Sequence, residues 1–220
     1  MSLKLYVFPP SPRSFKVMAL AAHLGLEHEL CVVDLGKGEN MSAEFAAINP
    51  NRRVPALEEN GFVLWEANAI LQYLAAKRPE RGLLPADPAS RALVAQWQFW
   101  DLAHWEAALT PIIWERCVKV LLELGEPDAS EIERGLAAFG EVAPILDGHL
   151  QESRFTAGSQ PTIADFSLGA TLNLSEMIGL PLDAYPHIRR WYRSLVELPG
   201  WRESMVRPPC NALESATVAA

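Results

Sequence analysis

The chain has 220 residues, half of them apolar and about a fifth charged, a composition typical of a globular protein with a sizeable core. Its formal net charge is −8, which argues against nucleic acid or an anionic membrane surface as a partner. The acidity is uneven, because residues 1–80 carry 8 basic and 9 acidic side chains, whereas residues 81–220 carry 11 and 18. The first part can therefore host an anionic ligand more easily than the total charge suggests.

Three cysteines, Cys31, Cys117 and Cys210, lie far apart and show neither Cys-x-x-Cys nor metal-ligand spacing. Such a sparse, odd set favours free thiols in a reducing compartment over a disulfide framework. The first residues run directly into a strand-like pattern without the apolar stretch expected of a signal peptide, and no apolar run approaches the length of a membrane span. We therefore expect a cytoplasmic protein without metal and without membrane segments.

Residues 1–78 alternate between strand and helix patterns. Strands are expected at Leu3–Phe8, Glu29–Val33, Val54–Leu57 and Phe62–Leu64, and helices at Arg13–Leu24, Ser42–Ile48 and about Ala67–Lys77. The strand-helix-strand spacing at the start implies a parallel pair, and Asn60-Gly61 is a strong hairpin signal. The order is βαβ followed by αββα.

Residues 79–88 are rich in proline, glycine and charge, and predict a linker. No strand is expected beyond it. Helices are predicted from Ser90 to about Leu124, after the capping box Ser130-Glu131-Ile132-Glu133, after the capping motif Thr162-Ile163-Ala164-Asp165, and over Pro186–Glu197, with a frayed tail from Pro208. Residues 89–220 thus predict an all-helical domain.

Three short motifs in the first domain could bear on chemistry, although each also has a purely structural explanation. Ser11-Pro12 is a good helix start, yet its hydroxyl and free N–H groups could also stabilise a thiolate. Val54-Pro55, if cis, would leave the Val54 backbone free to pair with an extended peptide. Glu66-Ala67-Asn68 suits a helix N-terminus, and equally a ligand ammonium beside a ligand carboxylate.

Two longer segments carry a family resemblance: Asn49-Pro50-Asn51-Arg52-Arg53-Val54-Pro55-Ala56-Leu57 and Leu64-Trp65-Glu66-Ala67-Asn68-Ala69-Ile70-Leu71-Gln72-Tyr73-Leu74. Together they resemble the glutathione-site signature of the cytosolic glutathione transferases. That family has a thioredoxin-like α/β domain followed by an all-α helical-bundle domain, which agrees with the predicted order over nearly the whole chain. Thr162–Asp165 also resembles its capping box in the second domain.

The resemblance implies roles for individual residues. Ser11 matches the serine that activates the glutathione thiol in the theta, delta and phi classes. Val54, before a cis proline, matches the residue whose backbone pairs with the cysteinyl part, and Glu66 matches the acid at the γ-glutamyl end. The remaining glutathione-binding candidates are Arg53, which stands at a Gln or Lys position, and Lys37 and Asn40, in the loop that meets the glycyl carboxylate.

The chain departs from the family pattern at Ala67, where the family usually has a serine that bonds the γ-glutamyl carboxylate. The N–H of Ala67 survives, so we expect weakened binding; a lost hydrogen bond to a charged group costs roughly 1.5–3 kcal/mol. Asp34-Leu35-Gly36-Lys37-Gly38 and the turn from Ser11 to Lys16 also resemble nu-like bacterial members, which reduce disulfides with glutathione and do not depend on one activating hydroxyl.

The stretch from Gln96 to Trp105 is unusually aromatic, which first of all suits a core and interface helix. In the family this helix also lines the second-substrate pocket and faces a partner subunit. The resemblance therefore implies a homodimer, with Asp101 at a position that in some classes reaches across it. The candidates for the second-substrate pocket are Phe8, Pro10, His104, Trp105, Leu109 and Trp114.

Three functions remain open at this stage. The first is conjugation of the glutathione thiolate, as co-substrate, to a small hydrophobic electrophile. The second is glutathione-dependent disulfide reduction in which no cysteine of the protein takes part. The third is a binding module that keeps the fold without activity, and Ala67 is the feature that favours it.

Overall fold

Four strands form one mixed sheet in the order β2-β1-β3-β4. β1 (Leu3–Val7) runs parallel to β2 (His28–Val32) and antiparallel to β3 (Ala56–Glu59), which pairs antiparallel with β4 (Phe62–Trp65). The computed structural model describes residues 3–205. The tail predicted from Pro208 and the thiol of Cys210 lie outside these residues.

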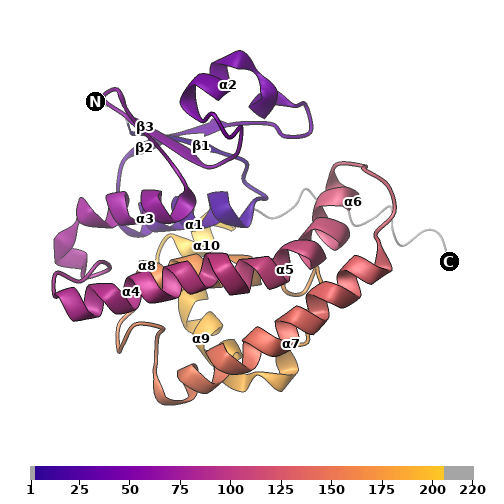
Figure 1. Ribbon diagram of the computed structural model, residues 1–220. Helices are drawn as coiled ribbons and strands as arrows, with labels where there is room; N and C mark the ends of the chain where they lie inside the picture. Colours follow the sequence, from indigo (N-terminus) through magenta and orange to yellow (C-terminus); the bar gives the residue numbers. More distant parts are fainter. Residues whose placement is uncertain (1–2, 206–220) are drawn as a thin grey trace.

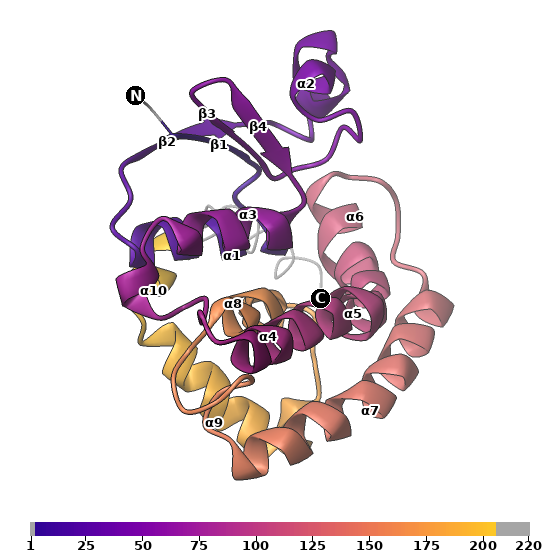
Figure 2. The same cartoon turned by 60° about the vertical axis from the view of Figure 1, so that its left-hand side comes forward.

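Three helices accompany the sheet: α1 (Pro12–His23), α2 (Ala43–Ile48) and α3 (Ala67–Ala76). In Figure 2, α1 and α3 lie between the sheet and the helices of the second half, and α2 lies away from those helices. This arrangement is thioredoxin-like, and the predicted order βαβ then αββα is confirmed. The third strand begins two residues later than expected, at Ala56.

Local sequence explains how α1 and β1 form. Ser11 caps α1 and its hydroxyl accepts from the N–H of Ser14, while Pro12 occupies the first helical position, where its missing N–H costs nothing. Along β1, Leu3, Leu5 and Val7 point into the core and alternate with partly exposed residues. The helix start that carries Ser11 is therefore fixed directly after the central strand.

Beyond Arg78 the described chain is helical. The elements are η2 (Pro79–Arg81), α4 (Pro88–Trp100), η3 (Asp101–Trp105), α5 (Glu106–Ile113), η4 (Trp114–Val118), α6 (Lys119–Leu121), α7 (Ala129–Glu152), α8 (Ile163–Gly169), η5 (Ala170–Leu174), η6 (Leu182–Ala184), α9 (Pro186–Val196) and α10 (Trp201–Ser204), with η1 (Glu39–Met41) in the first half. α4, α5 and α7 form the long arms of this bundle (Figure 1). The limits at residues 78 and 88 remain our proposed domain boundaries.

Of the two capping boxes predicted in the helical half, the structure confirms one and contradicts the other. The capping box at Thr162 and Asp165 is confirmed, since the Thr162 N–H donates to Oδ2 of Asp165 at 2.8 Å and the Thr162 hydroxyl caps α8. The capping box at Ser130 is wrong. Asp128 is the N-cap of α7, and its carboxylate accepts from the N–H groups of Ser130 and Glu131. A carboxylate competes well with a serine hydroxyl for this position.

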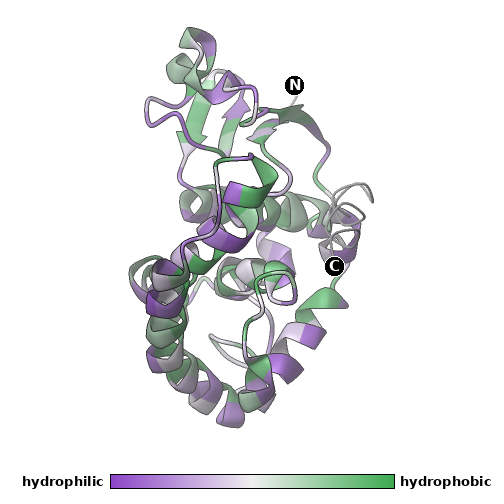
Figure 3. Cartoon of the chain, turned by 90° about the vertical axis from the view of Figure 1, so that its right-hand side faces the viewer, coloured by the Kyte–Doolittle hydropathy of each residue, from purple (hydrophilic) through white to green (hydrophobic). Residues whose placement is uncertain are grey.

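The larger of two apolar clusters among the described residues runs through both halves of the molecule, and the smaller one gathers around Val33, Phe45 and Val54. At the junction Phe15 of α1 packs edge-to-face on Trp201 of α10, with ring centroids 5.1 Å apart. The long helices in Figure 3 carry both polar and apolar residues, as expected of helices that bury one face. None of the described helices combines the length and apolar character needed to traverse a bilayer.

Candidate functional site

The Val54-Pro55 peptide bond is cis, as predicted. Among the described residues, neither the N–H nor the C=O of Val54 has a hydrogen-bond partner. Val54 lines a cavity of about 260 Å³, which we call the polar groove; its walls are Arg13, Asn49, Asn51, Arg53, Val54, Pro55, Glu66 and Ala67. An extended peptide could thus add to this backbone as a strand adds to a sheet edge.

The start of α3 forms one end of the polar groove. Glu66 precedes the helix with φ +73°, a conformation that residues other than glycine rarely adopt, and its carboxylate is exposed. Within residues 3–205 no side chain caps α3, so its first N–H groups are available to an anion. Strained backbone of this kind gathers at binding sites. The geometry offers a carboxylate for a cation beside N–H groups for an anion.

A second cavity of about 310 Å³, which we call the apolar pocket, adjoins the groove. Arg13, Arg53 and Val54 line both cavities. The other walls are Phe8, Pro10, Ser11, Pro12, Leu35, Asn40, Arg52, Ile113, Trp114, Cys117, Val118, Leu121, Leu122 and Leu174. The Ser11 hydroxyl therefore lies on a pocket whose helical wall is almost wholly apolar.

The six residues expected at the second-substrate pocket divide into two groups. Phe8, Pro10 and Trp114 line the apolar pocket. His104 is exposed beside Trp100, outside both cavities. Trp105 and Leu109 are completely buried in the core, where the Trp105 indole N–H donates to the carbonyl of Leu168 at 3.1 Å.

The residues expected at the glycyl end are also divided. Asn40 lines the apolar pocket and donates from Nδ2 to the carbonyl of Arg52 at 3.0 Å, which ties this loop to the segment before Val54. Lys37 is exposed, forms an ion pair with Asp34 at 3.0 Å and lines neither cavity. Arg53 is exposed and lines both.

Comparison with known proteins bears on this geometry. Residues 1–76 match the family described as glutathione S-transferase, N-terminal domain, and residues 129–194 match the C-terminal domain. Glutathione S-transferase D7 of Drosophila melanogaster is 33% identical over 208 residues, which cover 93% of this chain and 89% of that protein. The chain belongs to the glutathione S-transferase family.

Other relatives agree. Glutathione S-transferase 3 of Zea mays is 31% identical, with 94% of this chain and 95% of that protein covered. Among solved structures, a theta-class glutathione S-transferase of Xanthomonas axonopodis pv. citri with glutathione bound has a TM-score of 0.84 at 26% identity, covering 94% of this chain and 98% of that one. Glutathione S-transferase III in apo form has a TM-score of 0.83 at 31% identity, covering 95% and 100%.

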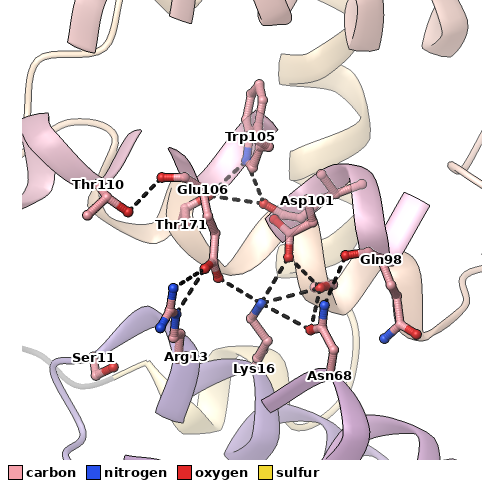
Figure 4. A network of polar contacts seen from close by, with 12 residues as sticks. Ser11, Arg13, Lys16, Asn68, Gln98, Asp101, Trp105, Glu106, Thr110 and Thr171 are labelled. Carbon is pink, nitrogen blue, oxygen red and sulfur yellow. Dashed lines mark hydrogen bonds and ion pairs between the residues drawn. The ribbon is translucent and has the colours of Figure 1, made fainter. Parts of the chain in front are cut away.

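In this family member a buried ionic cluster lies behind the site (Figure 4). Lys16 of α1 is completely buried, and its Nζ lies 3.0 Å from Oδ2 of Asp101 and 3.0 Å from Oε1 of Glu106. Nζ also lies 3.3 Å from both Asn68 Oδ1 and Ser167 Oγ. These partners come from α3, η3, α5 and α8, so one lysine joins the two halves of the molecule.

The charges in this cluster are unequally shared. Burial works against the charge of Lys16, but Asp101 and Glu106 outweigh it and raise the pKa of the lysine. Glu106 also binds Arg13, so its two cations overcome the effect of burial and lower its pKa. Asp101 shares only Lys16, and burial raises its pKa; its Oδ1 has no partner among the described residues.

Asp101 therefore faces inward and binds Lys16, rather than reaching toward a partner subunit. The sequence alone did not indicate that Arg13 and Lys16 share a carboxylate partner. Glu106 lies 93 positions along the chain from Arg13 and 90 from Lys16. The one available signal was a lysine within the apolar stretch from Phe15 to Ala22, which the burial of α1 would force to find carboxylate partners.

Proposed function

We propose that the chain is a glutathione transferase that joins the glutathione sulfur to a small hydrophobic electrophile. The observation that carries the proposal is the junction of the two cavities at Val54, close to the Ser11 hydroxyl. A peptide in the polar groove and an apolar molecule in the pocket would meet there. Such convergence makes the reaction effectively unimolecular.

Glutathione fits the polar groove in one direction. The Val54 N–H and C=O pair with the cysteinyl residue, the start of α3 receives the γ-glutamyl carboxylate, and Glu66 receives the ammonium. The glycyl carboxylate then lies toward the exposed Arg53, with Asn40 nearby. Lys37 could contribute only by leaving Asp34.

Ser11 is the proposed activator of the thiol. A free thiol has a pKa of about 8.5, and lowering it by about two units requires roughly 2.7 kcal/mol of preferential thiolate stabilisation. The Ser11 oxygen already accepts from Ser14, which leaves its O–H to donate to the sulfur. The N-terminal end of α1 adds a favourable field.

The reaction needs no nucleophile from the protein. The thiolate forms a carbon–sulfur bond to the electrophile, a leaving group such as halide departs with the bonding electron pair, and the thiol proton passes to solvent. Cys117 lines the apolar pocket, but burial raises the pKa of its thiol. It is therefore protonated near neutral pH and a weaker nucleophile than the bound thiolate.

The proposal includes a homodimer and a cytoplasmic location. Phe99 of α4 is 70% exposed, and Leu93, Leu102, Phe62 and Trp65 are also exposed large apolar residues. A monomer would leave these side chains in water, and a two-fold symmetric contact would cover them. Cys31 and Cys117 are free thiols, which suits a reducing compartment.

The test is retention on immobilised glutathione, followed by turnover of an aromatic halide and of a small mixed disulfide. We expect retention and halide turnover, with a Trp114→Ala variant retained equally but slower with the halide, because Trp114 lines only the apolar pocket. Turnover of the disulfide alone would replace conjugation with glutathione-dependent reduction. Retention without turnover would leave a binding module.

A further inference from the structure

We propose that the Arg13 guanidinium binds the γ-glutamyl carboxylate of glutathione and thereby replaces the hydroxyl that is absent at Ala67. The inference rests on the proposed function, since it assumes glutathione in the polar groove. Arg13 and Ala67 line this groove together with Glu66. The carboxylate would thus lie between an arginine and the N-terminus of α3.

Arg13 is held in a way that leaves one donor edge open. Its Nε and Nη2 both bind Oε2 of Glu106, at 2.9 and 2.7 Å. Among the described residues, Nε and Nη2 have a partner and Nη1 has none. The side chain is 41% exposed, so the guanidinium is anchored on one side and accessible on the other. A planar guanidinium can bind two carboxylates in this manner.

The anchor itself is rigid. Glu106 is buried and its other oxygen, Oε1, binds the completely buried Lys16. Lys16 is in turn held by Asp101 (Figure 4). Arg13 therefore does not have to be ordered when the ligand arrives, and a preorganised donor binds more tightly than a flexible one. Lys16 and Glu106 act as positioning residues that need not touch glutathione.

The second reason lies in the groove. The γ-glutamyl end carries an ammonium as well as a carboxylate, and Glu66 is the acid available to the ammonium. At Ala67 only backbone N–H groups face the carboxylate. An arginine beside Glu66 supplies the missing charged partner and sets the orientation of the γ-glutamyl group, with its cation toward Glu66 and its anion toward Arg13.

The experiment pairs an Arg13→Gln variant with a change in the ligand. Calorimetry compares glutathione with the analogue in which γ-aminobutyryl replaces γ-glutamyl, which keeps the ammonium and lacks this carboxylate. We expect Arg13→Gln to lower the affinity for glutathione by roughly tenfold to a hundredfold, as for a lost charged hydrogen bond. The affinity for the analogue should fall by less than about twofold, because the analogue lacks the carboxylate that Arg13 would bind.

Arg189→Gln is the matched control. Arg189 is also 41% exposed and paired with one carboxylate, that of Asp183, but it lies on α9 and lines neither cavity. We expect it to leave both affinities unchanged. If thermal unfolding shows that Arg13→Gln is not folded, Arg13→Lys takes its place. The lysine retains the charge beside Glu106 and loses the second donor edge.

Two results would overturn the inference. An equal loss of affinity for glutathione and for the analogue would make Arg13 a structural or thiol-directed residue. No loss of affinity for either ligand would mean that Arg13 is not part of the binding site. Both leave glutathione binding by the unaltered protein intact. Failure of the unaltered protein to bind glutathione is a different result, which overturns the proposed function itself.

Discussion

The Nζ atom of Lys16 lies 3.0 Å from Oδ2 of Asp101, and both side chains are completely buried. The pair joins α1 to η3 across 85 positions of the chain. Removing one member of a buried pair leaves the other charge without compensation, which is far more costly than losing an exposed pair. The junction between the two halves therefore depends on this lysine.

Lys16→Met should lower the free energy of unfolding by about 3–5 kcal/mol. Lys77→Met is the control, because Lys77 binds Glu59 at 2.6 Å with both side chains partly exposed; there the loss should be about 1 kcal/mol or less. Denaturant unfolding measures both. Similar losses in the two variants would contradict the importance of the buried cluster.

Gly200→Ala should disrupt the packing of α10 against α1. Gly200 has φ +82°, and an added Cβ would overlap the backbone of His23 and come within 2.8 Å of the Ala22 carbonyl carbon. Gly25→Ala is the comparison, since Gly25 has φ +62° with open space around it and should cost only the conformational term of about 1 kcal/mol. The melting temperature of Gly200→Ala should fall much further.

Stability should decline in alkali in part because of Tyr6. Burial, reinforced by a hydrogen bond of 2.8 Å to Glu58, raises the pKa of Tyr6 to about 12. Since the unfolded value is about 10, between these two values the unfolded chain has lost a proton that the folded chain still holds. Folding stability therefore falls as pH rises through this window. Tyr6→Phe should flatten the decline, measured by urea unfolding; an unchanged slope would exclude Tyr6 as its source.

Much of the first half could be predicted because its signals are local. The hairpin at Asn60-Gly61, the cap at Ser11 and the cis Pro55 are each set by neighbouring residues or by a family motif. The residues of the helical half that line the pocket were harder to predict. Trp105 ends a π turn, η3, and such a turn adds a residue to the helical repeat. The family resemblance implied that Trp105 and Leu109 line the pocket, but in this chain both side chains are completely buried in the core.

Ala67→Ser should tighten glutathione binding by about fivefold, equivalent to about 1 kcal/mol. The hydroxyl would add one bond to the γ-glutamyl carboxylate at the positive end of α3, and serine is scarcely larger than alanine. Since this interaction is the same in substrate and transition state, the maximal rate should not change. Calorimetry and steady-state kinetics measure the two effects; equal affinities would mean that the groove has been rebuilt around Ala67.

Ser11→Ala should lower the transfer rate at neutral pH by roughly tenfold to a hundredfold, through the loss of a charged hydrogen bond. It also removes the cap of α1, worth about 1 kcal/mol of stability. Asp87→Ala removes a comparable cap, that of α4, away from both cavities, and should lower stability alone. If Ser11→Ala behaves like Asp87→Ala, Ser11 is only a helix cap.

The most direct measurement is the pH titration of the bound glutathione thiolate by its ultraviolet absorbance. We expect a midpoint well below the free-thiol value of about 8.5, and a return toward that value in Ser11→Ala. A bound thiol that titrates like free glutathione in the unaltered protein would contradict thiol activation at this site, and with it the account of the protein as a transferase.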